Sequence, residues 1–356
     1  MSRALGAAAL GCVLLVGGLT FGTPSLYLPA VALILLGIGA AAWVALAAAG
    51  AAIERTPGPH TVEEDQPWPL MLDSRPGIVA PPGGELSEPL LGRPLRVGFG
   101  APRRVRIDVR FERRGRRVLE PARLSIRDPL GLAERVTESA AGEVLVLPRI
   151  EPVVAPGSGA SGRLGSRSAR PLAESAEVEI DGLRPYREGA PAGRIHWPVV
   201  ARGGPMMERR LVADSDSRPL VVLDARRPPS EDALDRAVRA AASLVVHLAR
   251  AGSCALLLPG DRRPTELDPE LRSWAPLHVR LALIAPDERP PAAGRIERLG
   301  AVLWVAAAPG VPAGLARAAA GQRWIVTPSD GPPPPGGFSV AGCTGRLLGA
   351  AAARAA

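Results

Sequence analysis

The chain has 356 residues, a formal net charge of +8 and 43 basic side chains, all of them arginine. This length allows two or three domains with a full hydrophobic core. Arginine is scattered through every segment and aromatic residues make up only 3%, which argues against a nucleic-acid-binding protein, because such proteins concentrate basic and stacking side chains on one face. The charge instead suits a protein near an anionic membrane.

The N-terminal segment, residues 1–55, is predicted to be a transmembrane helical hairpin. No charged residue occurs from Ala4 to Ile53, and two apolar runs, at about 4–20 and 26–52, flank a break that contains Gly22 and Pro24. A run of about 17 residues or more is needed to cross the hydrocarbon layer. The alternative for the first run is a cleaved signal peptide, which also begins with a basic residue and an apolar stretch.

The arginines at the two ends of this segment predict its orientation. Arg3 precedes the first run and Arg55 follows the second. Because basic residues favour the cytoplasmic side, we expect both ends, and the bulk of the chain, in the cytoplasm at the cell membrane.

Residues 56–150 are predicted to form an antiparallel β-sandwich-like domain. Arg104–Phe111 alternates apolar and polar residues, the pattern of a half-buried strand. Arg113–Arg116 predicts a turn that would pair this strand with the one at Val118-Leu119. Further strands are expected at Arg123–Arg127 and Gly142–Leu147.

Residues 151–175, rich in Gly, Ser, Pro and Arg, are predicted to be a flexible linker, and a distinctive segment follows at 176–215. Residues 216–356 are predicted to form an α/β domain with a parallel sheet. Leu220–Asp224 is an apolar strand, Ser230 caps a helix, and Cys254–Leu258 is the next strand. Later elements are expected at 276–285 (helix), 301–305 (strand), 312–320 (helix), 324–327 (strand) and from Phe338, with a strand and a helix.

Two motifs resemble a known family. One is Asp128-Pro129-Leu130-Gly131-Leu132, and the other runs from Leu183-Arg184-Pro185-Tyr186-Arg187-Glu188-Gly189 through Arg194-Ile195-His196-Trp197 to Ala201-Arg202. With the apolar hairpin, they are similar to the domain of unknown function 58 family, membrane-anchored MoxR-associated proteins with a von Willebrand A-like domain. The resemblance covers nearly the whole chain. It implies a divergent von Willebrand A-like (Rossmann-like) fold for 216–356.

The chain departs from the family pattern at two places. Ala190 stands where the family has Asp after the motif glycine, and the segment Asp224–Pro228 keeps only Asp224 of the D-x-S-x-S metal motif. Mg²⁺ requires several oxygen ligands, and an Arg beside one carboxylate repels the ion. We therefore expect no metal ion and no other cofactor.

The aromatic residues and the histidine of the second motif suggest an active site, but no nucleophile motif such as G-x-S-x-G accompanies them. The main expectation is that Tyr186 and Trp197 pack at the joint between the two domains. The motif residues that would otherwise meet a partner are Arg184, Tyr186, Gly189, Arg194, His196, Trp197 and Arg202.

The resemblance implies a non-enzymatic, membrane-anchored protein that acts with a MoxR-type AAA+ ATPase as adaptor or scaffold in the assembly or maturation of protein complexes. Its other partner would be membrane lipid, with no nucleic acid and no small-molecule substrate. The alternatives are an extracytoplasmic adhesion or binding module, or an accessory of an envelope hydrolase or transglutaminase system.

Overall fold

A computed structural model describes residues 2–97, 104–155, 180–186, 196–211, 218–287, 289–292, 299–317 and 320–348. The chain divides into two compact units, Met1–Leu147 and Pro148–Ala356. Each unit has a hydrophobic core of its own.

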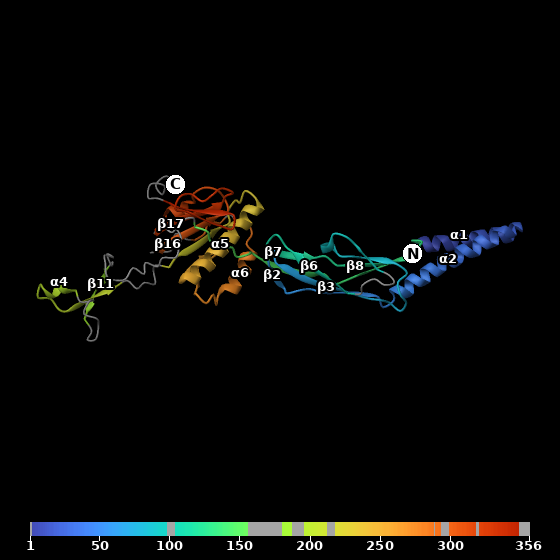
Figure 1. Cartoon of the computed structure of the whole chain (residues 1–356), viewed down its shortest axis with the longest axis horizontal. Helices are drawn as coiled ribbons and strands as arrows, with labels where there is room; N and C mark the ends of the chain where they lie inside the picture. The colour runs from blue at the N-terminus through green and yellow to red at the C-terminus, as the bar shows by residue number, and fades with distance from the viewer. Residues whose placement is uncertain are drawn as a thin grey trace. The chain divides into compact units, whose positions relative to one another are not determined.

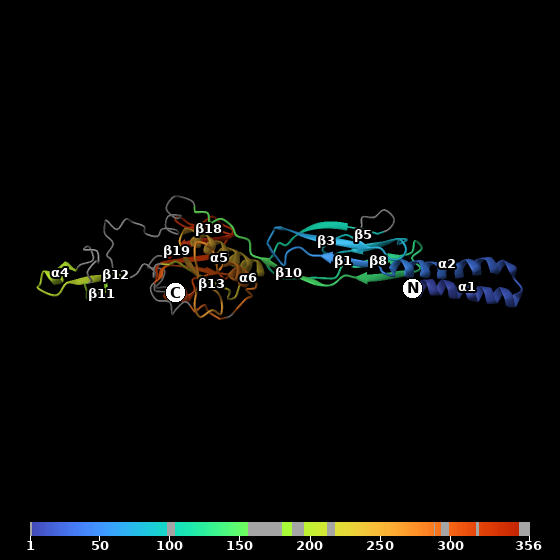
Figure 2. The same ribbon diagram turned by 90° about the horizontal axis from the view of Figure 1, so that it is seen from below.

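The first unit begins with two antiparallel helices, α1 (Ser2–Phe21) and α2 (Tyr27–Ala48), joined through a short 3₁₀ turn at Pro24–Leu26. They lie side by side in both views (Figures 1 and 2). Both are long and apolar enough to cross a membrane; the 20 residues of α1 give a rise of roughly 30 Å, the thickness of the hydrocarbon core.

Glycines let the two helices approach closely. A Cβ atom at Gly11 would lie 2.6 Å from the carbonyl oxygen of Ala30, and one at Gly37 would lie 2.5 Å from that of Ala4. Small residues at such contacts are typical of helix pairs in membranes, where close backbone packing replaces the hydrophobic effect as the source of stability.

The rest of the first unit is built from three small sheets around one core. The strands are β1 (Ala52–Thr56), β2 (Thr61–Glu63), β3 (Pro67–Arg75), β4 (Gly84–Ser87), β5 (Leu95–Arg96), β6 (Arg104–Arg110), β7 (Gly115–Leu119), β8 (Arg123–Arg127), β9 (Glu134–Glu138) and β10 (Gly142–Leu147). The sheets have the orders β1-β3-β6, β2-β10-β7 and β5-β4-β8-β9. Trp68, Leu70, Leu124 and Ile126 lie in their shared core.

The strands predicted at 104–111, 123–127 and 142–147 are present, but the predicted hairpin of β6 with β7 is wrong. β6 pairs with β3, and β7 pairs with β10. The domain is also not purely antiparallel, because β2 and β10 run parallel. Alternation of apolar residues identifies a strand but carries no information about its partner.

The first unit contains a buried ion pair. Arg55 on β1 donates to both carboxylate oxygens of Glu88 at 2.8 and 2.7 Å, and to the carbonyl oxygen of Glu120 at 2.6 Å. The side chains of Arg55 and Glu88 are 4% and 0% exposed. Arg55 is therefore part of the folded core, and only Arg3 remains as a free basic residue flanking the helices, which weakens the sequence argument for orientation.

The second unit contains a seven-stranded mixed sheet in the order β15-β14-β13-β16-β17-β19-β18. Its strands are β13 (Leu220–Asp224), β14 (Cys254–Leu257), β15 (Thr265–Leu267), β16 (Leu299–Ala306), β17 (Ala320–Pro328), β18 (Phe338–Val340) and β19 (Cys343–Leu347). The four strands β14, β13, β16 and β17 run parallel, as predicted, and antiparallel strands flank them. The predicted sheet is thus parallel only at its centre.

Three described helices accompany this sheet: α5 (Glu231–Ala251), α6 (Trp274–Ala282) and α7 (Ala313–Arg317). Helices α5 and α6 cover one face, where Leu244 and Leu281 pack with Leu223. Leu315 of α7 packs with Val222 and Trp304 on the other face. The cap at Ser230 is confirmed, since its side chain accepts the backbone N–H of Ala233 at 3.1 Å. The helix expected after Phe338 lies outside the described residues.

Residues 151–155, which the prediction assigned to a flexible linker, are tied to the second unit. The backbone N–H of Glu151 donates to Ser243 Oγ at 2.9 Å, and Val154 forms an antiparallel bridge with Ser339. Val153 and Ala155 pack against the core beneath α5. The remainder of the predicted linker, from 156 on, lies outside the described residues.

Candidate functional site

The first candidate site lies where the strand order of the large sheet reverses. The chain passes from β13 outward to β14 and β15, then returns to the other side of β13 as β16. In open α/β sheets, ligands bind beyond the carboxyl ends of the two strands at this reversal. Here those ends are Asp224, the last residue of β13, and Ala306, its partner in register on β16.

The carboxylate of Asp224 is buried and fully occupied. Arg226 donates to Asp224 Oδ1 from Nε at 2.8 Å and to Oδ2 from Nη2 at 2.7 Å. Trp304 Nε1 adds a bond to Oδ2 at 3.1 Å, and the backbone N–H of Arg226 reaches Oδ1 at 3.2 Å. The hydrogen bond to Asp224 raises the pKa of Arg226. A metal ion at this carboxylate would have to displace a guanidinium that already neutralises it.

A pocket of about 300 Å³ opens at this edge of the sheet. The end of β13 and the loop after it contribute Asp224, Arg226 and Arg227 to its wall, and the end of β16 and the loop after it contribute Ala306, Ala308, Pro309, Gly310, Val311 and Pro312. Arg227 is exposed and has a left-handed backbone with φ of 45°. Among the lining residues, Asp224 and Arg226 neutralise each other as an ion pair, and no ion pair is found for the guanidinium of Arg227.

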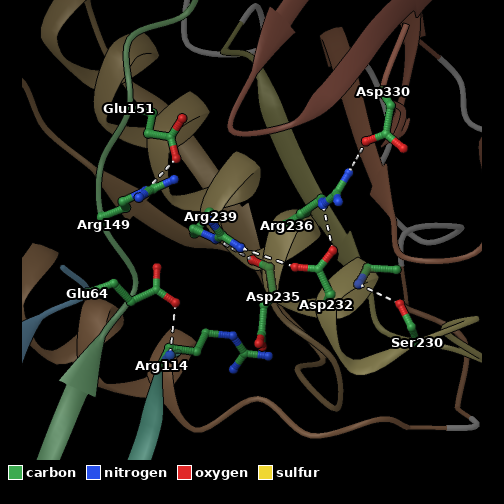
Figure 3. A network of polar contacts seen from close by, with 11 residues as sticks. Glu64, Arg114, Arg149, Glu151, Ser230, Asp232, Asp235, Arg236, Arg239 and Asp330 are labelled. Carbon is green, nitrogen blue, oxygen red and sulfur yellow. Dashed lines mark hydrogen bonds and ion pairs between the residues drawn. The ribbon is translucent and has the colours of Figure 1, made fainter. Parts of the chain in front are cut away.

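The N-terminal half of α5, just beyond this edge, is fixed by ion pairs that Figure 3 shows. Arg236 donates to Asp232 at 2.7 Å, one turn earlier on the helix, and to Asp330 at 2.5 Å. Asp330 follows β17, so Arg236 ties the start of α5 to the neighbouring end of the sheet. The loop from Asp224 to Ser230 is thereby held at both ends.

The second candidate site lies in the segment 176–215, which we call the signature segment. Its described residues include a two-stranded antiparallel sheet of β11 (Ile180–Pro185) and β12 (Met207–Leu211). Tyr186 and His196 come together at one end of it. Their backbone N–H groups donate to the carbonyl oxygens of consecutive residues, Met206 at 3.0 Å and Met207 at 2.8 Å.

A short helix, α4 (Trp197–Val200), begins directly after His196. Trp197 is 55% exposed, Arg202 is exposed, and Tyr186 and His196 are half-buried. This exposure of Trp197 is higher than expected for a side chain packed at a domain joint. The packing of Tyr186 and Trp197 between the two domains stays a prediction. Register places Arg184 opposite Glu208 on the neighbouring strand. Gly189 and Arg194 lie outside the described residues.

The sequence offers two acids, Asp181 and Glu188, that could orient His196 as a catalytic base. Asp181 lies at the far end of the ladder, since Ile180 pairs with Leu211 whereas Pro185 pairs with Met207. Five strand residues separate these ends by roughly 16 Å. The other candidate, Glu188, lies outside the described residues.

Other reactive side chains of the second unit are occupied in the core. His278, 5% exposed, contacts the carbonyl oxygen of Pro148 through Nε2 at 2.7 Å and stacks on Trp274. Burial raises the pKa of the thiols of Cys254 and Cys343 to about 12, so both are protonated and poorly nucleophilic at neutral pH. Within the described residues, no cluster of three metal-ligating side chains is found.

Asp224 could be identified from the sequence, whereas Trp304 and Arg227 could not. The apolar run around Trp304 predicts a strand, yet nothing in it shows that the strand lies beside β13. The exposed Arg227 gives no signal in an arginine-rich chain.

A scan against protein-family models finds no match for this chain, and searches of curated proteins and of solved structures find no significant match either. The resemblance to the domain of unknown function 58 family thus stays a prediction from the sequence motifs.

Proposed function

We propose that this chain is a membrane-anchored, non-enzymatic binding protein that works with a MoxR-type AAA+ ATPase as an adaptor or scaffold in the assembly of protein complexes. The choice of partner rests on the resemblance to the domain of unknown function 58 family. The observation that supports a binding role is the signature segment, which exposes Trp197 and Arg202 beside a small sheet. Exposed Trp and Arg are typical of residues that dominate protein–protein recognition.

Membrane anchoring is supported by the way α1 packs with the first unit. Ala4 is 1% exposed, and its backbone N–H donates to the carbonyl oxygen of Leu132 at 3.0 Å. Removal of a signal peptide would take away these contacts together with the glycine contacts between α1 and α2. A retained hairpin is thus the proposed arrangement. The cytoplasmic location of the bulk of the chain is proposed from the arginine that precedes the hairpin.

A divergent, metal-independent von Willebrand A-like domain is the proposed identity of the second unit. The reversal of strand order at β13 and the position of Asp224 at the end of that strand support it. In this reading Arg226 supplies the positive charge that a divalent ion would otherwise bring to Asp224.

The partner is tested by capturing the full-length protein from native membranes with ATP present and identifying the captured proteins by mass spectrometry. Trp197→Ala and Arg202→Glu should each reduce recovery of a AAA+ ATPase at least about tenfold, a loss of roughly 1.4 kcal/mol or more. Leu283→Ala, at a position that is 46% exposed near the end of α6, is the matched control and should leave recovery unchanged. If no AAA+ ATPase is recovered with the unmodified protein, the adaptor function is wrong.

Orientation is tested by labelling Val118→Cys, at an exposed position of β7, in intact cells. A membrane-impermeant maleimide should react only after the membrane is opened. Reaction in intact cells would place the bulk of the chain outside and favour the adhesion alternative.

A further inference from the structure

Two apolar loops of the β-strand part of the first unit lie next to α1 and α2. The first joins β3 to β4 and carries Ile78 and Val79, which are 75% and 38% exposed. The second joins β8 to β9, is the Asp128–Leu132 motif, and carries Leu130, 64% exposed. Trp43 of α2 is 42% exposed. We call the four side chains Trp43, Ile78, Val79 and Leu130 the apolar rim.

Hydrogen bonds hold both loops against the bases of the helices. The carbonyl oxygen of Leu132 accepts the N–H of Ala4, at the start of α1. The N–H of Ile78 donates to the carbonyl oxygen of Ala49 at 3.0 Å, just after α2. Trp43 Nε1 donates to the carbonyl oxygen of Ala80 at 3.3 Å. The rim therefore lies beside the ends of α1 and α2 that join the β-strand part of the first unit.

The local structure of each loop turns its apolar side chain outward. Asp128, 3% exposed, accepts the N–H of Leu130 at 2.9 Å and that of Ala133 at 2.5 Å, so the polar residue faces inward. Gly131 has φ of 69°, a conformation that glycine adopts without strain. A Cβ at Gly77 would lie 2.1 Å from the carbonyl oxygen of Ala47, so only glycine lets this loop approach the end of α2.

Charge changes abruptly at the rim. The loop segments 76–84 and 129–133 contain no charged residue. The strand ends behind them carry exposed ion pairs, Arg75 with Glu54 at 2.9 Å and Arg127 with Glu85 at 3.6 Å. An apolar edge that projects past a charged belt, next to two apolar helices, has the polarity profile of a bilayer interface, where Trp is also enriched.

We propose that the apolar rim inserts into the interfacial layer of the bilayer that α1 and α2 span. The rim would thereby hold the β-strand part of the first unit against the membrane in a fixed orientation. The proposal rests on the proposed membrane anchoring. Lipid is the occupant that the structure favours because the rim is continuous with the exposed apolar surface of the helices, which includes Leu5 and Leu46. The Asp128–Leu132 motif then has a physical role, which is to present Leu130 to lipid.

The test is the depth of single labels in the full-length protein reconstituted in phosphatidylcholine vesicles. An environment-sensitive fluorophore is placed at Leu130→Cys, Ile78→Cys or Val118→Cys, with the three native cysteines replaced by serine or alanine. Val118 is the matched control, since it is an aliphatic residue of the same unit that is 73% exposed but not in either loop. A fourth protein retains only Cys12, which is exposed on α1 within the predicted span.

Lipids brominated near the headgroup end of the acyl chains should quench the labels at positions 130 and 78 at least about twofold more than the label at 118. Lipids brominated near the chain ends should quench the label at Cys12 most. If Cys12 is quenched and positions 130 and 78 behave like 118, the rim proposal is wrong while the anchoring stands. If Cys12 is not quenched, the anchoring itself fails. Emission at 130 and 78 that shifts to the blue without quenching by either lipid would indicate a protein contact, such as a second copy, and would also overturn the proposal.

Discussion

Replacing Glu88 with glutamine is expected to destabilise the first unit strongly, because it leaves the guanidinium of Arg55 charged and buried. The side chains are 0% and 4% exposed, so water cannot take the place of the carboxylate. Loss of one partner of a buried ion pair costs about 3–5 kcal/mol. Arg55 keeps bonds to the carbonyl oxygens of Leu119 and Glu120, so we expect a value near the lower limit, about 3 kcal/mol.

The measurement is amide hydrogen exchange in β3 and β8 of the full-length protein in lipid vesicles, which reports the free energy of opening of the surrounding sheet. A loss of about 3 kcal/mol corresponds to roughly a hundredfold faster exchange. Glu54→Gln is the matched control, since its pair with Arg75 has side chains 50% and 63% exposed and such pairs contribute about 0–1 kcal/mol. Equal effects of the two substitutions would refute the reasoning from burial. The paired change Arg55→Met with Glu88→Leu should recover most of the stability, because it removes both charges together.

Three further predictions follow from contacts and burial. Gly37→Val should weaken the helix hairpin by about 1–3 kcal/mol through overpacking, whereas Gly39→Val, with nothing within 4 Å of its Cβ, should not; interhelix disulfide trapping in membranes compares the two, and equal trapping would contradict the packing described. Asp224→Asn should speed exchange in β13 by about tenfold or more, because a charge-assisted pair contributes roughly 1.5–3 kcal/mol; unchanged exchange would show that the guanidinium is not held there. Cys254 and Cys343 should resist alkylation at pH 8 in the folded protein and react once it unfolds. Because their folded pKa of about 12 exceeds the unfolded value of 9.0, the contribution of these thiols to stability should be constant below pH 9 and should fall as the pH rises from there towards 12. Labelling in the native state, or a stability that is higher for the native thiols than for a Cys-to-Ala variant at pH 11 relative to pH 8, would contradict their burial.

Local signals in the sequence were enough to predict the elements that depend on local physics. The apolar helices follow from an uncharged stretch of about the right length, and α5 follows from the cap at Ser230 and its helical periodicity. β10 was predicted with its observed bounds, Gly142–Leu147, because its alternation is clear and turn residues flank it.

Pairings between distant segments could not be predicted in the same way. The partner of β6 is β3, and the partner of β10 on one side is β2, whose three residues carry little pattern of their own. The contact of Trp304 with Asp224 likewise depends on β16 lying beside β13. In each case the sequence shows which face of a strand is apolar, whereas the partner is chosen by packing over the whole unit.

The bridge between Val154 and Ser339 has a consequence for how the second unit is assembled. The segment before the signature hairpin and the strand near the C-terminus meet in one core, so the hairpin is an insertion within a domain. Synthesis of the chain must reach Phe338 and the residues after it before this junction can close. Both ends of the hairpin are joined by the chain to this one domain. A force that pulls on the hairpin would therefore load the domain at two points of its sequence.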